Sequence, residues 1–240
     1  MKDSEDPKDA LEPSAGARSR DLVLASVQTV PALGPVAAWL LAQAWPSPLS
    51  RRLVELLSDI TDRITDLETS ERLDREKLLE NDAFQAAIFR AIPSAMGTVS
   101  QEKRRALRNV ALNAALGILP ADDLFEMFLR YVDDFTGLHI KLLQVAEELK
   151  SLDMAVDSDG STLVFDVTVR ARQKAIEGAY PELRGLDGTY EQAWSELVNR
   201  GLVKDDHDGS VFSNETGLGV DVEYLTPLGR QFLDFISDPG

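Results

Sequence analysis

The chain lacks cysteine altogether and has only two histidines, His139 and His207, in 240 residues. The absence of cysteine excludes disulfides, thiolate metal sites and cysteine nucleophiles, and it fits a reducing compartment. A zinc site would need carboxylates for nearly all of its ligands, because the two histidines lie far apart in the sequence. We therefore expect no metal site, no cofactor and a cytoplasmic location.

Motifs that bind phosphate or activate a serine are also missing. The sequence contains neither Gly-x-x-x-x-Gly-Lys nor Gly-x-Ser-x-Gly, and no strand is followed by Gly-x-Gly-x-x-Gly. Carboxylates are abundant, but on the helices of an acidic protein their expected place is the solvated surface. We therefore expect no enzymatic activity, no catalytic residues and no small-molecule substrate.

Basic residues are scarce, and they become scarcer along the chain. The sequence has 25 Lys and Arg against 41 Asp and Glu, a net charge of −16. Residues 121–179 carry 6 basic and 12 acidic side chains, and residues 180–240 carry 4 and 12. DNA binding draws most of its affinity from cations placed on phosphates, so nucleic acid is not the expected partner.

Charge is absent from residues 22–50, which follow a polar stretch, residues 1–20, predicted to be a disordered tail. The uncharged segment has the length of a membrane span, but Pro31, Gly34 and Pro35 divide it into two short pieces. It has two interpretations. One is a helical hairpin buried in the protein's own core or at an oligomer interface. The other is a segment that acts at a membrane, where the lipid or partner contacts would be Trp39, Leu40, Leu41 and Trp45.

A heptad-spaced helix follows between residues 49 and 67. Apolar side chains recur at intervals of four and three, and charged side chains fill the other positions, which predicts an amphipathic helix. Its seam consists of Leu53, Leu57, Ile60, Ile64 and Leu67. The pattern covers just over two heptads, so packing within a helical bundle and a self-association seam are both compatible with it.

Two further helices are predicted before residue 120. The first begins near Asp82 and is ended by the stretch Pro93-Ser-Ala-Met-Gly97, and the second is capped by Ser100 and runs to about Leu116. The second helix holds the chain's basic cluster, Lys103, Arg104, Arg105 and Arg108. We interpret this cluster either as a face for lipid phosphates or nucleic acid, or as a solvated face paired with the many carboxylates.

The C-terminal part, residues 121–240, predicts a winged helix-turn-helix-like domain. After helices from Asp122, from Thr136 or Gly137 and from Val167, a helix at 187–200 stops at Gly201. Strands at 202–203 and 222–225 would form a small β-hairpin wing, and Thr226-Pro227 opens a last helix. A second hairpin is expected within residues 152–165. The fold class is therefore mainly α, with an N-terminal helical region at 21–120.

The helix at 187–200 occupies the place of a recognition helix, yet it is acidic. It offers Asp187, Glu191 and Glu196 against Arg200 alone. The expected wing loop, residues 205–219, is acidic as well. Such a surface would repel a duplex, which favours a structural or protein-contact role for this module.

Three stretches resemble a known family. They are Glu102-Lys-Arg-Arg-Ala-Leu-Arg-Asn-Val-Ala-Leu-Asn-Ala-Ala-Leu116, the helical pair within Phe125–Leu143, and Tyr224-Leu-Thr-Pro-Leu-Gly-Arg-Gln-Phe232. In this order they resemble the bacterial abortive-infection alpha family, a group linked to phage defence, over about residues 100–236. The resemblance implies a bacterial protein of stress or phage defence, and it supplies no catalytic residues.

We arrive at one hypothesis and two alternatives. The hypothesis is a non-enzymatic effector or adaptor, peripheral to the inner membrane or self-associating through its apolar segment. The first alternative is a winged-helix transcriptional regulator, which requires one basic surface built from Lys103, Arg104, Arg105, Arg108, Arg170, Arg172 and Lys174. The second alternative is a structural oligomerisation or protein-interaction module.

Overall fold

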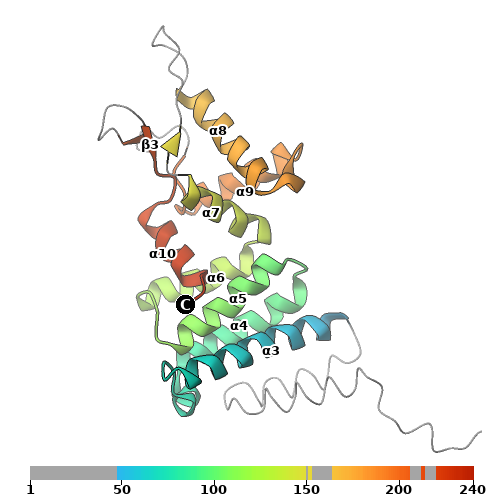
Figure 1. Cartoon of the computed structure of the whole chain (residues 1–240), viewed down its shortest axis with the longest axis vertical. Coiled ribbons are helices and arrows are strands. Elements are labelled where there is room, and N and C mark those ends of the chain that lie inside the picture. Colours follow the sequence, from blue (N-terminus) through green and yellow to red (C-terminus); the bar gives the residue numbers. More distant parts are fainter. Residues whose placement is uncertain (1–47, 150, 153–163, 206–211, 214–219) are drawn as a thin grey trace, which may run out of the picture. The chain divides into compact units, whose positions relative to one another are not determined.

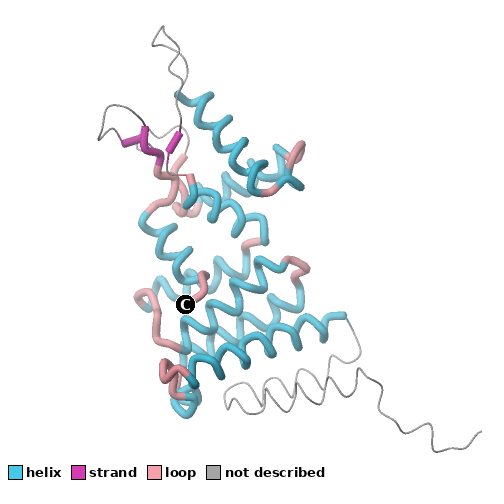
Figure 2. The backbone as a smooth tube through the Cα atoms, viewed as in Figure 1, coloured by secondary structure: helices cyan, strands magenta, loops and turns pink. Residues whose placement is uncertain are grey.

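The computed structural model describes residues 48–149, 151–152, 164–205, 212–213 and 220–240 (Figure 1). These residues are mainly helical, which confirms the fold class expected from the sequence (Figure 2). The tail at 1–20, the apolar segment up to residue 47 with Trp39, Leu40, Leu41 and Trp45, most of the hairpin expected at 152–165 and most of the expected wing loop lie outside the described residues.

The chain divides into two compact units, which are described separately below. The described part of unit 1 comprises residues 48–97 and 114–117, and unit 2 comprises residues 98–113 and 118–240. The division therefore falls at Gly97 and not at the expected position near residue 120. Most of the helix with the basic cluster belongs to unit 2.

Unit 1 is built on two helices that pack side by side, α3 (Pro48–Thr69) and α4 (Asp82–Gly97), with the short 3₁₀ helix η2 (Arg75–Glu80) between them in sequence. The predicted amphipathic helix is confirmed as α3. All five seam residues, Leu53, Leu57, Ile60, Ile64 and Leu67, are buried, each at most 2% exposed. They face the core of the chain, where Phe84 and Ile88 of α4 are also buried.

Of the two interpretations of this spacing, the burial of the seam favours packing within a helical bundle over self-association. Two heptads of apolar spacing specify only that a helix has one apolar face, and α4 of the same chain supplies a partner for that face. The spacing alone does not distinguish a helix of the same chain from a helix of a second copy.

Helix α4 ends at Gly97, the last residue of the stretch predicted to end it, and it continues through Pro93. Proline lacks a backbone N–H and costs one helical hydrogen bond, but tertiary packing can hold the next turn in place. Here Ile92 and Ala95 extend the buried face beyond the proline. The guanidinium of Arg52 donates a hydrogen bond to the Met96 carbonyl at 3.1 Å, which satisfies a carbonyl at the helix end.

The end of α3 places a non-glycine residue in the left-handed region. The Arg72 N–H donates to the Leu67 carbonyl and the Glu71 N–H to the Glu68 carbonyl, the two hydrogen bonds of a Schellman motif. The residue that reverses the chain in such a motif has positive φ, and here it is Glu71, with φ of 58°. The corresponding residue at the end of the helix before residue 202 is Gly201, as predicted, with φ of 71°.

Unit 2 contains six α-helices among its described residues. They are α5 (Gln101–Ala115, whose last two residues belong to unit 1), α6 (Asp122–Asp134), α7 (Gly137–Glu148), α8 (Val164–Ala179), α9 (Asp187–Asn199) and α10 (Pro227–Ile236). A 3₁₀ turn, η3 (Pro181–Leu183), precedes α9. The helix predicted from Val167 is confirmed and begins slightly earlier.

Three very short strands form the sheet of unit 2. Strands β1 (Ser151–Leu152), β3 (Val220–Val222) and β2 (Phe212–Ser213) lie in the order β1-β3-β2 and pair antiparallel. Val203 and Leu225 form an isolated antiparallel bridge. Strands 202–203 and 222–225 of the expected small β-hairpin wing pair only through this one bridge, so the wing is not supported.

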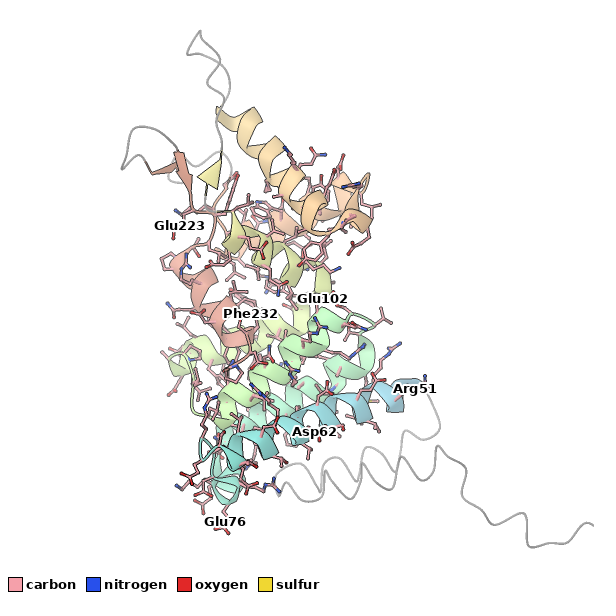
Figure 3. The ribbon with its side chains drawn as sticks, in the orientation of Figure 1. Arg51, Asp62, Glu76, Glu102, Glu223 and Phe232 are labelled. Carbon is pink, nitrogen blue, oxygen red and sulfur yellow. The ribbon has the colours of Figure 1, made fainter. Side chains whose placement is uncertain are left out.

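An aromatic cluster from α6 and α10 forms the core of unit 2. The Phe128 ring lies 5.1 Å from the Phe232 ring and 5.7 Å from the Phe235 ring, and the Phe135 ring lies 5.7 Å from Phe232 (Figure 3). The edge-to-face geometry of the pairs with Phe232 is favoured by the aromatic quadrupole. This cluster fixes α10 against α6.

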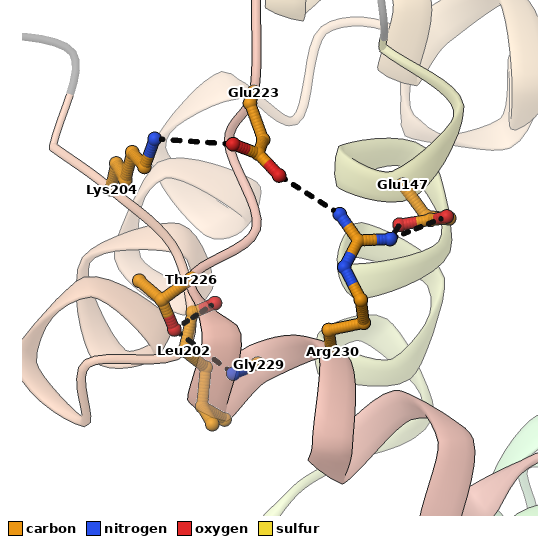
Figure 4. A network of polar contacts seen from close by, with 7 residues as sticks. All are labelled: Glu147, Leu202, Lys204, Glu223, Thr226, Gly229 and Arg230. Carbon is orange, nitrogen blue, oxygen red and sulfur yellow. Dashed lines mark hydrogen bonds and ion pairs between the residues drawn. The ribbon is translucent and has the colours of Figure 1, made fainter. Parts of the chain in front are cut away.

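The N-terminus of α10 is fixed by the predicted cap. The Thr226 hydroxyl oxygen accepts the Gly229 N–H at 2.9 Å and lies 3.2 Å from the Leu202 carbonyl (Figure 4). A Cβ atom on Gly229 would collide with the Leu202 carbonyl, so this position has no room for any other residue. The Leu-Thr-Pro-Leu-Gly stretch is thus explained by a cap and a close backbone approach.

Candidate functional site

The charged side chains of α9 were expected to form an acidic reading face, but they bind partners inside unit 2. The pairs are Asp187 with the Tyr190 hydroxyl at 2.9 Å, Glu191 with Arg172 at 3.0 Å, Glu196 with His139 at 3.0 Å, and, just after the helix, Arg200 with Asp134 at 2.8 Å. The exposed positions along α9 include the uncharged Gln192, Ser195 and Asn199 as well as Asp187. Helix α9 is therefore fixed to its neighbours by its own charges.

Arg172 of α8 is the most deeply buried of the charged partners, at 2% exposed. Its guanidinium lies over the Trp194 ring, 4.6 Å from the ring centre, and donates to the Glu191 carboxylate. Stacking on an aromatic face together with a carboxylate is a favourable environment for a buried arginine. Arg172 was expected to contribute to a basic surface, and that expectation is wrong because the side chain joins α8 to α9.

His139 connects α7 to α9 in one defined protonation state. The backbone N–H of Thr136 donates to His139 Nδ1 at 3.2 Å, so Nδ1 must act as an acceptor without a proton. The proton then resides on Nε2, which donates to Glu196 at 3.0 Å. The ring also stacks on Phe135, with centroids 4.9 Å apart.

Burial lowers the pKa of His139 below its ordinary value, although Glu196 acts in the opposite direction. Arg200 and Lys103 also face the ring and favour its neutral form. The imidazole thus serves as the fourth residue of a capping box, with Thr136 as its first. A neutral, buried histidine of this kind is a structural group and not a metal ligand.

The basic cluster on α5 does not form one face. Lys103 is 8% exposed and donates its ammonium to the Asp133 carbonyl at 2.7 Å, and burial lowers its pKa. Arg108 contacts Asp238 at 3.2 Å, Arg104 donates to the Val99 carbonyl at 3.3 Å, and Arg105 is exposed. The expected lipid or partner surface of Lys103, Arg104, Arg105 and Arg108 is therefore wrong for Lys103.

Helical spacing explains this outcome. Lys103 precedes the buried Leu107 and Val110 by four and seven residues, which places it on the apolar face of α5. Arg104, Arg105 and Arg108 lie on the other side of the helix. The four basic residues are close together in sequence, but neighbouring residues of a helix point in different directions, so the four side chains do not share one face.

A polar network joins α7, α10 and the segment before α10. Both Glu147 carboxylate oxygens accept from Arg230 Nη1 at 3.0 Å, and Arg230 Nη2 donates to Glu223 at 3.1 Å (Figure 4). Lys204 lies 3.7 Å from the same Glu223. The network neutralises two carboxylates and fixes the start of α10.

Unit 1 and unit 2 each have a surface hollow. In unit 1, a hollow of about 620 Å³ lies at the end of α3, and its rim charges are paired as Arg75 with Glu68 and Lys77 with Asp74. In unit 2, an apolar hollow of about 220 Å³ lies between the loop Ile118–Pro120 and α10. Ile118 and Leu119 at its rim are 49% and 40% exposed.

Two kinds of feature, metal-binding side-chain groups and membrane-spanning helices, are absent from the described residues. No group of three or more histidine, cysteine, aspartate or glutamate side chains within the described ranges is placed to hold a metal ion. Among the helices of the same ranges, none has both the length and the apolar character needed to cross a bilayer.

Sequence reasoning missed two asparagines of α5. The Asn109 side-chain amide donates to the Ile236 carbonyl at 2.9 Å, and the Asn113 amide donates to the Phe235 and Ser237 carbonyls at 2.8 and 2.9 Å. These carbonyls at the end of α10 have no helical donor of their own. The signal was present as two asparagines four residues apart on an otherwise apolar helix face.

Comparisons with models of known protein families, with curated proteins and with solved structures find no match to this chain.

Proposed function

We propose that this protein is a non-enzymatic effector or adaptor of bacterial stress or phage defence, as its resemblance to the abortive-infection alpha family implies. In this proposal, unit 2 is a winged-helix-like scaffold and the apolar segment before α3 is the acting part. The observation that carries the proposal is the pairing of the charges on α9 within unit 2. A helix whose charges are used internally supports a scaffold role.

The winged-helix assignment is supported by the order of elements in unit 2. Helices α7, α8 and α9 are followed by the Val203–Leu225 bridge and then by α10. The Lys204 N–H donates to the Tyr224 carbonyl at 2.7 Å, which extends this pairing by one residue. Three helices followed by a returning chain support a winged-helix-like assignment.

A DNA-binding regulator is less well supported by the same geometry. Of the seven basic residues that such a function requires on one surface, Lys103 and Arg172 are buried and Arg108 is paired with Asp238. Counterion release needs cations that reach phosphates, and these three side chains are already engaged. Helix α9 itself carries no basic residue that could take their place.

A protein-interaction module is the second candidate, favoured by the apolar hollow in unit 2. Its rim exposes Ile118 and Leu119 above the buried ring of Phe235. Exposed apolar groups around a small hollow are typical of a surface that receives one apolar side chain of a partner. This candidate requires no membrane.

The test of the proposed function is co-sedimentation of the full chain with phospholipid vesicles. The matched control is the full chain with Leu40→Asp and Leu41→Asp, which places two charges in the uncharged segment. We expect the unaltered chain to pellet with vesicles and the control to stay in the supernatant. Because Lys103 is buried, we expect neutral phosphatidylcholine and anionic phosphatidylglycerol vesicles to retain the chain similarly. A chain that never pellets would contradict the membrane role and leave the protein-interaction module as the better candidate.

A further inference from the structure

Helix α4 is apolar on both of its faces. Its inner face buries Phe84, Ile88 and Ile92. On its outer face Phe89 is 63% exposed and Pro93 is exposed, with Ala86 and Met96 partly exposed beside them. Asp82 and Arg90 are the only charged residues in the whole helix. Both of these charged residues are exposed, and between and beyond them Phe89 and Pro93 leave an apolar patch that a partner would cover.

Helix α3 offers no comparable face. Its outer positions carry Glu55, Asp59, Asp62 and Asp66, all of them exposed, and Figure 3 labels Asp62 among them. An uncharged segment packed on these carboxylates would bury little apolar surface. It would also remove water from charged groups, which costs free energy. Of the two long helices in unit 1, α4 alone has an apolar outer face.

The chain itself contains a segment that matches this face. Residues 22–47 carry no charge, and the segment ends where α3 begins, at Pro48. The hydrogen bond from Arg52 to the Met96 carbonyl places the first turns of α3 beside the end of α4 that carries Pro93 and Met96. Pro48, to which the segment is joined, therefore belongs to the helix turn that lies near this end of α4.

We propose that residues 22–47 dock on the outer face of α4, defined by Ala86, Phe89, Pro93 and Met96. Docking there removes the apolar side chains of both partners from water. A segment tethered at Pro48 has an effective concentration in the millimolar range, which favours it over a second copy of the chain. The proposal rests on the proposed function, since it identifies α4 as the surface that holds the acting segment until it is released.

The absence of cysteine makes a direct test possible, because any introduced thiol is the only one in the chain. Pro93→Cys places a thiol in the middle of the outer face and leaves Phe89 intact. Leu186→Cys, at a position 47% exposed in unit 2, is the matched control. We expect a maleimide dye to label the thiol at 93 in the full chain at least about tenfold more slowly than the thiol at 186. Adding Leu40→Asp and Leu41→Asp should raise the rate at 93 about tenfold and leave the rate at 186 unchanged.

A second measurement avoids altering the proline. In a Trp194→Phe chain, tryptophan emission comes only from Trp39 and Trp45. Phe89→Glu in this background should move the emission to longer wavelength and increase quenching by acrylamide, whereas Leu186→Glu should do neither. An emission spectrum that Phe89→Glu leaves unchanged would overturn the proposal.

The labelling experiment has several outcomes that overturn the docking. These are equal labelling rates at 93 and 186, protection at 93 that survives the two aspartates, protection that disappears on dilution, and protection that appears only with vesicles. The third outcome identifies a second copy as the occupant, and the fourth a membrane. If the chain pellets with vesicles while the thiol at 93 labels freely, the effector function stands and the docking fails.

Discussion

His139 shows how a single side chain can make stability depend on pH. In the folded chain Nδ1 accepts the Thr136 N–H, so a proton on Nδ1 would point at another proton. Burial lowers the pKa of this imidazole, whereas in the unfolded chain its pKa lies near 6.5. Below about pH 6.5 the unfolded chain therefore binds a proton that the folded chain does not, and the free energy of unfolding falls as the pH falls.

We predict that His139→Gln flattens this dependence between about pH 7 and pH 5. Glutamine at this position still offers an oxygen to the Thr136 N–H, as capping boxes commonly do, but it does not titrate. Urea unfolding at a series of pH values measures the slope, and His207→Gln measures the share of the other histidine. Glu196, whose pKa is lowered by hydrogen bonds from Gln192 and His139, acts at lower pH. An unchanged slope in His139→Gln would show that the imidazole is not the titrating group.

Glu71 is a second residue that affects stability, in this case through its backbone conformation. A φ of 58° costs a residue with a Cβ about 1–2 kcal/mol, and glycine avoids that cost. Glycine also stabilises the unfolded chain by about 0.4–1 kcal/mol, because its backbone has more conformational entropy there. We therefore predict that Glu71→Gly raises the free energy of unfolding by about 0.5–1 kcal/mol, measured by urea denaturation.

The control for this prediction is Glu71→Ala, which removes the same carboxylate but keeps the Cβ atom. If alanine and glycine stabilise the chain equally, the gain comes from the lost charge and not from the backbone. The sequence does not identify Glu71 as the residue that reverses the chain, because glycine or asparagine usually occupies that position.

Among the elements, the junction between α10 and the segment at Leu202 is the tightest backbone contact described. We predict that Gly229→Ala lowers the free energy of unfolding by about 2–3 kcal/mol, because a Cβ atom there meets the Leu202 carbonyl. Gly178→Ala in α8 is the matched control, since nothing lies within 4 Å of the corresponding Cβ.

The control should be neutral or stabilising by up to about 1 kcal/mol, as expected for glycine to alanine within a helix. Thermal unfolding of the two variants beside the unaltered chain makes the comparison. Equal melting temperatures for Gly229→Ala and Gly178→Ala would contradict the close approach at Leu202.

Elements could be predicted from the sequence where apolar spacing and caps agree. The seam of α3, the Thr226 cap of α10 and Gly201 after α9 are all of this kind. Within the predicted ending stretch of α4, the sequence did not show that the helix would pass Pro93, because this depends on the burial of Ile92 and Ala95. The prediction failed at Lys103 and Arg172, because burial of a charge depends on a carbonyl or an aromatic ring brought from elsewhere in the chain.

For the molecule as a whole, the net charge of −16 is the dominant property. Most of the ion pairs in the described residues have at least one partly exposed partner, so each contributes little to stability. Repulsion among the excess carboxylates opposes the compact state, and salt screens it over about 8 Å at physiological ionic strength.

We predict that raising the sodium chloride concentration from low to physiological values increases the melting temperature of the chain. Differential scanning calorimetry measures the effect, and potassium chloride serves as a control for ion-specific binding. A melting temperature that falls with added salt would mean that the ion pairs outweigh the repulsion, contrary to this expectation.

The hydrogen bonds of the two α5 asparagines have a consequence for the order of folding during synthesis. Asn109 and Asn113 find their carbonyl partners more than 120 residues later in the sequence. A ribosome makes the chain from its N-terminal end, so α5 exists for most of synthesis with two polar side chains whose partners have not yet been made. During that interval its apolar face, with Leu107 and Val110, has no α10 beside it. Unit 2 should therefore mature late, and while it waits it should be a substrate for chaperones.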